Sequence, residues 1–132
     1  MTELSWPDEY SVGVDDFDFH HKRIFSMLNE LRESKDMDLK MKYDFISDLI
    51  RHIDYHLSRE EYFFEKFDYK DKKRHIKEHN KYRARMKKFN EKQKKGTLNI
   101  EELADFLERW WIEHITKEDK KYRKIMNENG VY

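Results

Sequence analysis

Two pairs of side chains with nitrogen or oxygen donors occur four residues apart in the middle of the chain. His56 precedes Glu60 by four positions, and His75 precedes His79 by the same step. On an α-helix such residues lie on one face, one turn apart, so each pair would present two donors side by side. Each pair alone also fits a solvated or ion-paired surface, because 42% of the chain is charged. The apolar residues that continue each stripe indicate instead that the pairs face inward, where buried polar groups need partners such as a metal ion.

The composition favours one helical domain. A length of 132 residues suits a single domain, which we predict to span residues 1–132. The chain holds three glycines and one proline, so long uninterrupted helices are favoured over many turns. The predicted fold class is therefore all-α.

Charge and cysteine content exclude several classes of function. Lys plus Arg and Asp plus Glu number 28 each, so no net field attracts the chain to nucleic acid or to an anionic membrane. No stretch approaches the roughly 20 apolar residues that span a bilayer, and residues 1–10 do not resemble a signal peptide. We therefore expect a soluble, cytoplasmic protein without nucleic-acid or membrane partners. Cysteine is absent, so any metal must take nitrogen and oxygen ligands.

Helical periodicity begins only after an irregular N-terminal arm. Residues 1–16 lack a helical pattern and hold the only proline, Pro7. We expect Trp6, Tyr10 and Val12 to pack this arm onto the body. Four helices are predicted to follow within residues 17–127.

Capping residues and periodic stripes set the expected bounds of these helices. The first begins near Asp16 to Asp18, which can cap it, and runs to about residue 32, and the second follows the cap Asp38 and covers about residues 39–67. The third runs from about residue 72 to 94, where Gly96 fits a left-handed residue that stops it. The fourth opens at a capping box, Asn99 with Glu102, and runs to about residue 127. The expected inward stripe of the second helix reads Met41, Phe45, Leu49, Ile53, His56, Glu60, Phe64 and Phe67.

Short connections between four long helices favour an antiparallel up-down-up-down bundle. In that arrangement the late part of one helix lies beside the early part of the next. Donor side chains of all four helices should then meet at one end of the bundle. These residues are His21, His56, Glu60, His75, His79, His114 and Asp119.

The step from His114 to Asp119 is five residues, which displaces the two side chains by about 140° on a regular helix. We predict that the helix widens locally, as in a π-bulge, or that Asp119 reaches around toward the other donors.

Four short motifs follow one another along the chain, after an arm that contains Trp6 and Ser11-Val12-Gly13-Val14. They are Asp18-x-x-His21-Lys22, His56-x-x-x-Glu60-Glu61, His75-x-x-x-His79 and Trp110-x-x-x-His114-Ile115-x-x-x-Asp119. In order and separation they resemble the hemerythrin signature, and the arm is similar to that of bacterial members. Any one motif is common, but the ordered set spans the chain from Trp6 to Tyr122.

The resemblance implies a non-haem di-iron centre that binds molecular oxygen reversibly. By position, His75, His79 and His114 would hold one iron ion, and His21 and His56 the other. Glu60 and Asp119 would bridge the two ions together with an oxo or hydroxo group. The iron ion with two histidines would keep an open position for oxygen. Zinc or another divalent ion in the same cage is the alternative metal.

Three residues depart from the usual hemerythrin pattern. Leu57 stands where phenylalanine is usual, Trp111 where leucine is usual, and His20 where glutamine is usual. We predict that Trp111 narrows the open position and slows ligand entry; the alternative is that it only packs against another helix. His20 and His52 are expected at the surface or beside the ligands. The predicted oxygen pocket comprises Trp110, Trp111, Leu57, Ile115 and Ile24.

The sequence is compatible with three functions. The leading one is an oxygen carrier, store or scavenger without enzymatic activity. The first alternative is an enzyme that uses peroxide bound at a di-iron centre, but the chain lacks the Glu-x-x-His repeats of ferritin-like sites. The second alternative is a sensor module in which oxygen, redox or iron state changes a partner surface.

Overall fold

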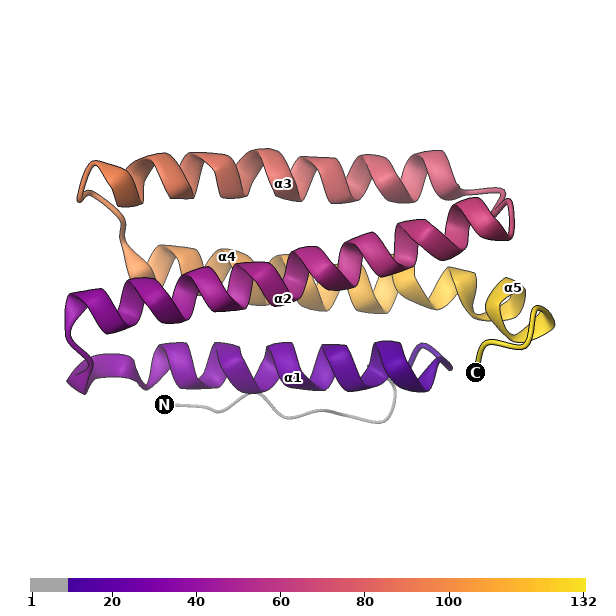
Figure 1. The fold of residues 1–132 in the computed structure, drawn as a ribbon, viewed down its shortest axis with the longest axis horizontal. Coiled ribbons are helices and arrows are strands. Elements are labelled where there is room, and N and C mark those ends of the chain that lie inside the picture. The colour runs from indigo at the N-terminus through magenta and orange to yellow at the C-terminus, as the bar shows by residue number, and fades with distance from the viewer. Residues whose placement is uncertain (1–9) are drawn as a thin grey trace.

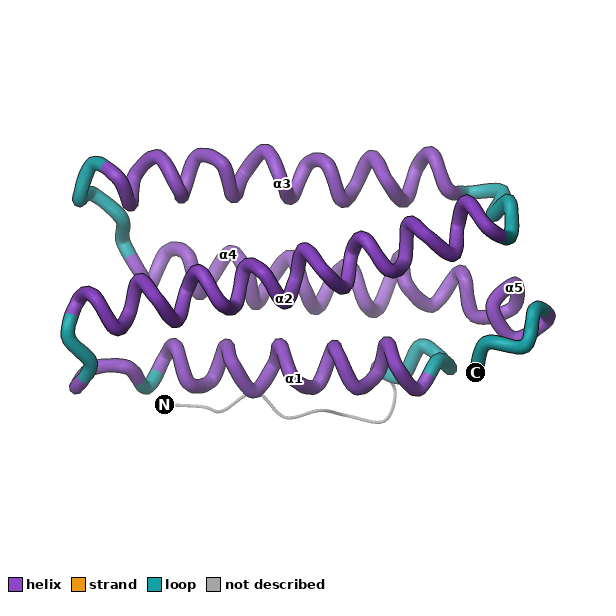
Figure 2. Tube along the Cα trace, in the orientation of Figure 1, coloured by secondary structure: helices purple, strands orange, loops and turns teal. Residues whose placement is uncertain are grey.

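Four long helices lie side by side in the computed structural model, which describes residues 10–132 (Figure 1). Helix α1 spans Asp15–Arg32, α2 spans Leu39–Lys66, α3 spans Lys72–Lys94 and α4 spans Ile100–Glu113. Successive helices run in opposite directions, so the order is up-down-up-down (Figure 1). No strand occurs within the described residues (Figure 2), and the predicted all-α bundle is confirmed.

The fourth helix is not regular to its end. A π-helical turn, His114–Glu118, follows α4, and a 3-10 turn, Asp119–Tyr122, follows that. A short α-helix, α5, then covers Arg123–Glu128 and ends close to the predicted residue 127. The predicted local widening of this helix is therefore confirmed.

The predicted caps of three helices are confirmed. The side chain of Asp38 accepts a hydrogen bond from the backbone N–H of Met41 at 2.8 Å, and Asn99 does the same for Glu102 at 3.1 Å. Gly96 has a φ of 72°, the left-handed conformation that ends α3. Each cap satisfies backbone groups that the helix leaves without intrahelical partners.

The predicted cap of α1 is wrong. The helix begins at Asp15 behind Val14, which has no side-chain cap. The carboxylate of Asp18 instead accepts hydrogen bonds from the Ser11 hydroxyl at 2.6 Å and from the Val12 N–H at 2.9 Å. It therefore fixes the chain that leads into the helix. The expected packing of Val12 is confirmed, because Val12 is fully buried, whereas Trp6 lies outside the described residues.

The core follows the predicted inward stripe of α2 only between Leu49 and Phe64, and Phe67 at its end is half-buried. In α2, the residues from Leu49 to Phe64 that were predicted to face inward are buried, but Met41 is 53% exposed. A helix turns 100° per residue, so a stripe centred on Ile53 and Glu60 has rotated away from the core by Met41. Ile46 is buried at the start of the stripe instead, and Phe45 is half-buried.

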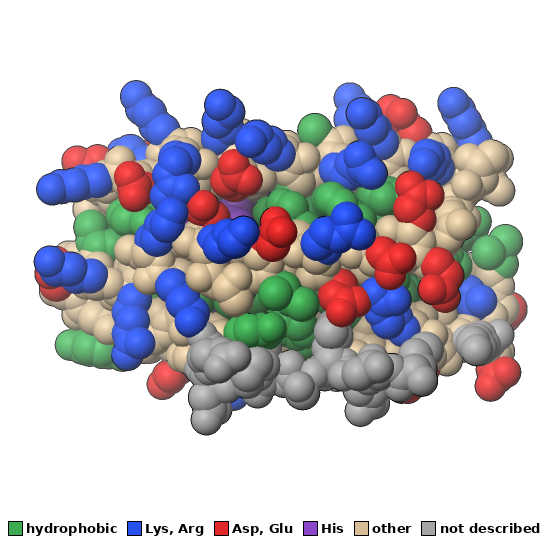
Figure 3. Space-filling model, turned by 180° about the vertical axis from the view of Figure 1, so that it is seen from behind, with side chains coloured by type: hydrophobic (Ala, Val, Ile, Leu, Met, Phe, Trp, Pro, Cys, Tyr) green, Lys and Arg blue, Asp and Glu red, His purple; other side chains and the backbone are tan. Residues whose placement is uncertain are grey.

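Charged side chains cover the outside of the bundle. Figure 3 shows Lys and Arg interleaved with Asp and Glu over one face, with small apolar areas between them. No helix within residues 10–132 has the length and hydropathy needed to cross a bilayer.

Replacing Asn99 by Ala should lower the free energy of unfolding by about 1 kcal/mol, because the Glu102 N–H loses its capping acceptor. Asn90→Ala is the matched control, since Asn90 is exposed inside α3 and Ala favours a helix interior. Urea denaturation of both variants measures the difference. Equal destabilisation by the two changes would contradict a capping role.

Candidate metal centre

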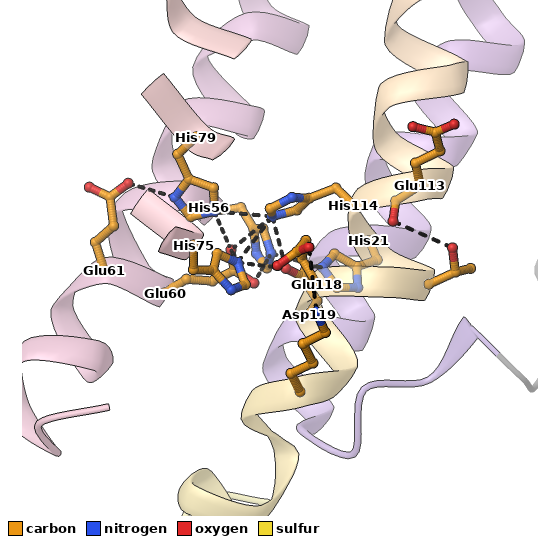
Figure 4. A network of polar contacts seen from close by, with 12 residues as sticks. His21, His56, Glu60, Glu61, His75, His79, Glu113, His114, Glu118 and Asp119 are labelled. Atoms are coloured by element: carbon orange, nitrogen blue, oxygen red, sulfur yellow. Dashed lines mark hydrogen bonds and ion pairs between the residues drawn. The ribbon is translucent and has the colours of Figure 1, made fainter. Parts of the chain in front are cut away.

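Seven donor side chains from α1, α2, α3 and the two turns that follow α4 converge in the core (Figure 4). All seven were predicted as ligands from the sequence. Six are fully buried, and His114 is 3% exposed. They are His21 from α1, His56 and Glu60 from α2, His75 and His79 from α3, and His114 and Asp119 after α4.

The donor atoms form two groups that share both carboxylates. In each group the donor atoms lie within 4.8 Å of one another. The first group, with three histidines, comprises His75, His79, His114, Glu60 and Asp119. The second group, with two histidines, comprises His21, His56, Glu60 and Asp119.

The two oxygens of Glu60 face different groups. Oε1 lies 3.1 Å from Nε2 of His79 and 3.8 Å from Nε2 of both His75 and His114. Oε2 lies 3.3 Å from Nε2 of His56. One carboxylate therefore spans the space between the groups.

The two carboxylate oxygens of Asp119 also face different groups. Oδ1 lies 2.8 Å from Nε2 of His114 and 3.0 Å from Nε2 of His75, whereas Oδ2 lies 3.3 Å from Nε2 of His21. The π-helical turn makes this possible, because it offsets the 140° displacement that a five-residue step has on a regular helix. The Thr116 hydroxyl donates to the carbonyl of Ile112 at 2.7 Å, which satisfies a backbone acceptor at the start of this turn.

The chemistry of the donors fits bound cations. Nε2 atoms face one another at 3.2 Å between His75 and His114, at 3.1 Å between His79 and His114, and at 2.8 Å between His21 and His56. None of the four carboxylate oxygens accepts a well-oriented hydrogen bond from a described residue. Buried anionic oxygens and opposed imidazole nitrogens are costly unless a positive charge lies between them. Imidazole and carboxylate donors suit iron, zinc and other divalent metals.

The carboxylates stay ionised in this core. Burial opposes ionisation, but the surrounding histidines outweigh it and lower the pKa of both Glu60 and Asp119. Burial likewise disfavours charge on His75, yet the two carboxylates raise its pKa to about 9 and that of His114 to about 10. Without a metal ion, protonated His75 and His114 therefore balance the two carboxylates, and a metal ion that binds takes the place of those protons.

Glu61 orients one of the histidines, although no role was predicted for it. Its carboxylate accepts from Nδ1 of His79 at 2.6 Å and from Arg83 at 2.8 Å. With the proton held on Nδ1, the Nε2 lone pair of His79 points into the cluster, as in carboxylate–histidine–metal arrangements. The sequence Glu60-Glu61 could have indicated this role. Adjacent residues on a helix point to different sides, so Glu61 cannot share the direction of Glu60 and is free to contact a neighbouring helix.

The two histidines outside the groups lie at or near the surface, as expected. His52 is exposed. His20 is half-buried, and its Nδ1 lies 3.1 Å from Nδ1 of His56, on the side opposite the cluster. Burial and the neighbouring His56 lower the pKa of His20 to about 4, so its imidazole is neutral and can accept a hydrogen bond from the Nδ1–H of His56 when Nε2 of His56 faces a metal ion.

The two tryptophans lie beside different histidine groups. The buried ring of Trp111 packs edge-on against His21 at 5.3 Å and His56 at 5.6 Å between ring centroids. Trp110, predicted for the same oxygen pocket, instead stacks on His114 at 4.5 Å, beside the group with three histidines. The other predicted pocket residues, Leu57, Ile115 and Ile24, are buried in the core.

The comparisons with known proteins agree with this geometry. The family model of the hemerythrin HHE cation binding domain matches residues 12–125. The chain belongs to the hemerythrin family. A bacteriohemerythrin of Clostridium acetobutylicum is 31% identical over 124 residues, which cover 89% of this chain and 96% of that protein. A bacteriohemerythrin of Pseudomonas aeruginosa is 28% identical over 92% of this chain and 80% of its own length.

Solved hemerythrin structures share the fold. The crystal structure of a wild-type hemerythrin superposes with a TM-score of 0.87 at 26% identity, covering 94% of this chain and 98% of the other. The four-helix bundle of the family therefore extends over nearly the whole chain.

Replacing Glu61 by Ala should weaken Co²⁺ binding by the metal-free protein about 10-fold to 100-fold, because His79 loses the acceptor that orients it. Glu65→Ala, one turn further along α2, is the control, since Glu65 is exposed and faces Lys72 at 3.6 Å. Competition with a chelator measures both affinities, and circular dichroism checks the fold. Equal affinities in the two variants would exclude the orienting role.

Proposed function

We propose that the protein binds molecular oxygen reversibly at a di-iron centre and serves as an oxygen carrier, store or scavenger. One observation carries the proposal: the two donor groups share both carboxylates but differ by one histidine. A metal ion in the group with two histidines would have one protein donor fewer. A position would then be left for a small ligand from solution.

The ligand roles follow from the two groups. His75, His79 and His114 would hold one iron ion, and His21 and His56 the other. In both Glu60 and Asp119, one carboxylate oxygen faces each group of histidines, which supports a bridging role for both carboxylates. Two ferrous ions would supply the electrons that reversible oxygen binding requires, one from each ion.

Aromatic side chains exclude water from the cluster, which favours release of oxygen over its reduction. Phe17 packs edge-on against His56 with 5.1 Å between ring centroids, and the ring centroids of Phe64 and His75 lie 4.6 Å apart. Trp111 covers the group with two histidines. An enzyme acting on a larger substrate would need access to that group, yet His21 and His56 are fully buried. We therefore place oxygen binding ahead of catalysis.

Metal analysis and optical spectroscopy test the proposal directly. The iron-loaded protein should contain two iron ions per chain. Its reduced form should gain a visible absorption band in oxygen and lose it under vacuum over repeated cycles. A single metal ion per chain, or irreversible oxidation in the first cycle, would contradict reversible binding at a di-iron centre.

Replacing Trp111 by Leu should speed azide entry into the oxidised, iron-loaded protein by about tenfold, which corresponds to roughly 1.4 kcal/mol of barrier. The smaller side chain opens space beside His21 and His56. Because a large core side chain is truncated, the free energy of unfolding should fall by about 2–4 kcal/mol. Stopped-flow mixing measures the entry rate.

Trp110→Leu is the matched control for this rate. Trp110 lies against His114 and Tyr82, away from the group with two histidines, so its replacement should leave azide entry nearly unchanged. An unchanged rate in Trp111→Leu would remove Trp111 as a gate and leave it a packing residue.

A further inference from the structure

A groove on the surface between α1 and α2 lies directly outside the group with two histidines. Its volume is about 430 Å³, which is in the range of pockets that bind small molecules. Most of its lining is apolar. Its lining includes Phe19, His20 and Arg23 from α1, and Arg51 and Tyr55 from α2.

Three aromatic rings form one wall of the groove. Phe19 is 69% exposed and Tyr55 is 59% exposed, although large apolar rings are normally withdrawn from water. The imidazole of His20 lies between them, with ring centroids 6.3 Å from Phe19 and 5.7 Å from Tyr55. Exposed rings around a small cavity favour a flat aromatic ligand, because such a ligand can pack against several of them at once.

The charges of the groove favour an anionic ligand. Of the described residues that line it, Asp48 supplies the one carboxylate, and Arg51 already pairs with it at 2.9 Å. Arg23 forms no ion pair with a described residue, so one guanidinium remains available. A guanidinium presents paired N–H donors that match the two oxygens of a carboxylate.

We propose that this groove is a binding site for a small, flat aromatic anion such as an aromatic carboxylate. The ring of the ligand packs against Phe19, His20 and Tyr55, and its carboxylate pairs with Arg23. The size of the cavity selects a ligand of one or two rings over a protein segment.

The groove is linked to the metal centre through one side chain. His20 lines the groove, and its Nδ1 contacts Nδ1 of His56, whose Nε2 faces Glu60 and His21. A ligand that packs on His20 therefore touches the residue that contacts His56. Residues that hydrogen-bond to a metal-binding histidine influence its orientation and its affinity for the metal. This step rests on the proposed function. A ligand in the groove changes the affinity of the metal centre for small ligands, and a small ligand at the metal centre changes the affinity of the groove by the same factor.

Calorimetry on the metal-free protein tests the groove independently of any metal. 2-Naphthoate should bind with one site per chain, and the neutral 2-naphthalenemethanol at least tenfold more weakly. Arg23→Gln should weaken 2-naphthoate binding about tenfold, corresponding to one charge-assisted contact. Arg109→Gln, an exposed position on α4 outside the groove, should leave it unchanged.

Three results of this experiment would overturn the site. They are absence of saturable binding, equal binding of the acid and the alcohol, and equal losses in Arg23→Gln and Arg109→Gln. Sedimentation as a dimer that Phe19→Ser dissociates would also overturn it, because a second copy of the chain would then cover the groove.

Azide titration of the iron-loaded protein tests the link. Saturating 2-naphthoate should change azide affinity several-fold, azide should change 2-naphthoate affinity by the same factor, and His20→Gln should abolish both effects. Unchanged azide affinity would overturn the link. If the chain took up no iron, the proposed function would fail, whereas the calorimetry of the metal-free protein would still decide whether the groove binds aromatic anions.

Discussion

Two buried carboxylates that each face two sets of histidines are the constraint on which this structure depends. Glu60 and Asp119 are fully buried, and each places one oxygen toward each group of imidazoles. A buried anion without a compensating charge costs several kcal/mol, and no Lys or Arg reaches these oxygens among the ion pairs of residues 10–132. The core therefore tolerates them only with protonated histidines or bound cations beside them. The same requirement explains why the bundle holds polar donors from all four helices at one level, where apolar packing alone would favour leucine.

The irregular end of the fourth helix is a consequence of that constraint. A regular helix that continued past His114 would turn Asp119 about 140° away from the cluster. The π-helical turn brings the carboxylate back, and the following 3-10 turn returns the chain to α5. Buried Tyr122 then packs against Phe17 and Phe64, which ties the altered segment to α1 and α2. Local backbone irregularity is thus held in place by aromatic packing and by the polar cluster together.

Much of this arrangement could be predicted from the sequence, because the period of a helix converts spacing into direction. The donors at steps of four had to share a face, and the five-residue step from His114 to Asp119 could not fit a regular helix. What could not be predicted depends on contacts between helices. The contact of Glu61 with His79, and that of His20 with His56, depend on the rotation of neighbouring helices about their axes. The cap of α1 could not be predicted for a similar reason, since the preceding loop takes up the carboxylate of Asp18.

Two of the three residues that depart from the usual hemerythrin pattern, His20 and Trp111, lie beside the group with two histidines. His20 contacts His56 from outside, and Trp111 packs against both His56 and His21. The opposite side is held by the charged pair of Glu61 and Arg83 behind His79 and by the stacking of Trp110 on His114. A hydrogen bond to a carboxylate fixes the tautomer and the orientation of an imidazole. The group with three histidines therefore has a carboxylate behind one of its imidazoles, whereas the group with two histidines has an imidazole and an indole as neighbours. Both of these departures lie beside the group with two histidines, so a change of neighbour there acts directly on its imidazoles.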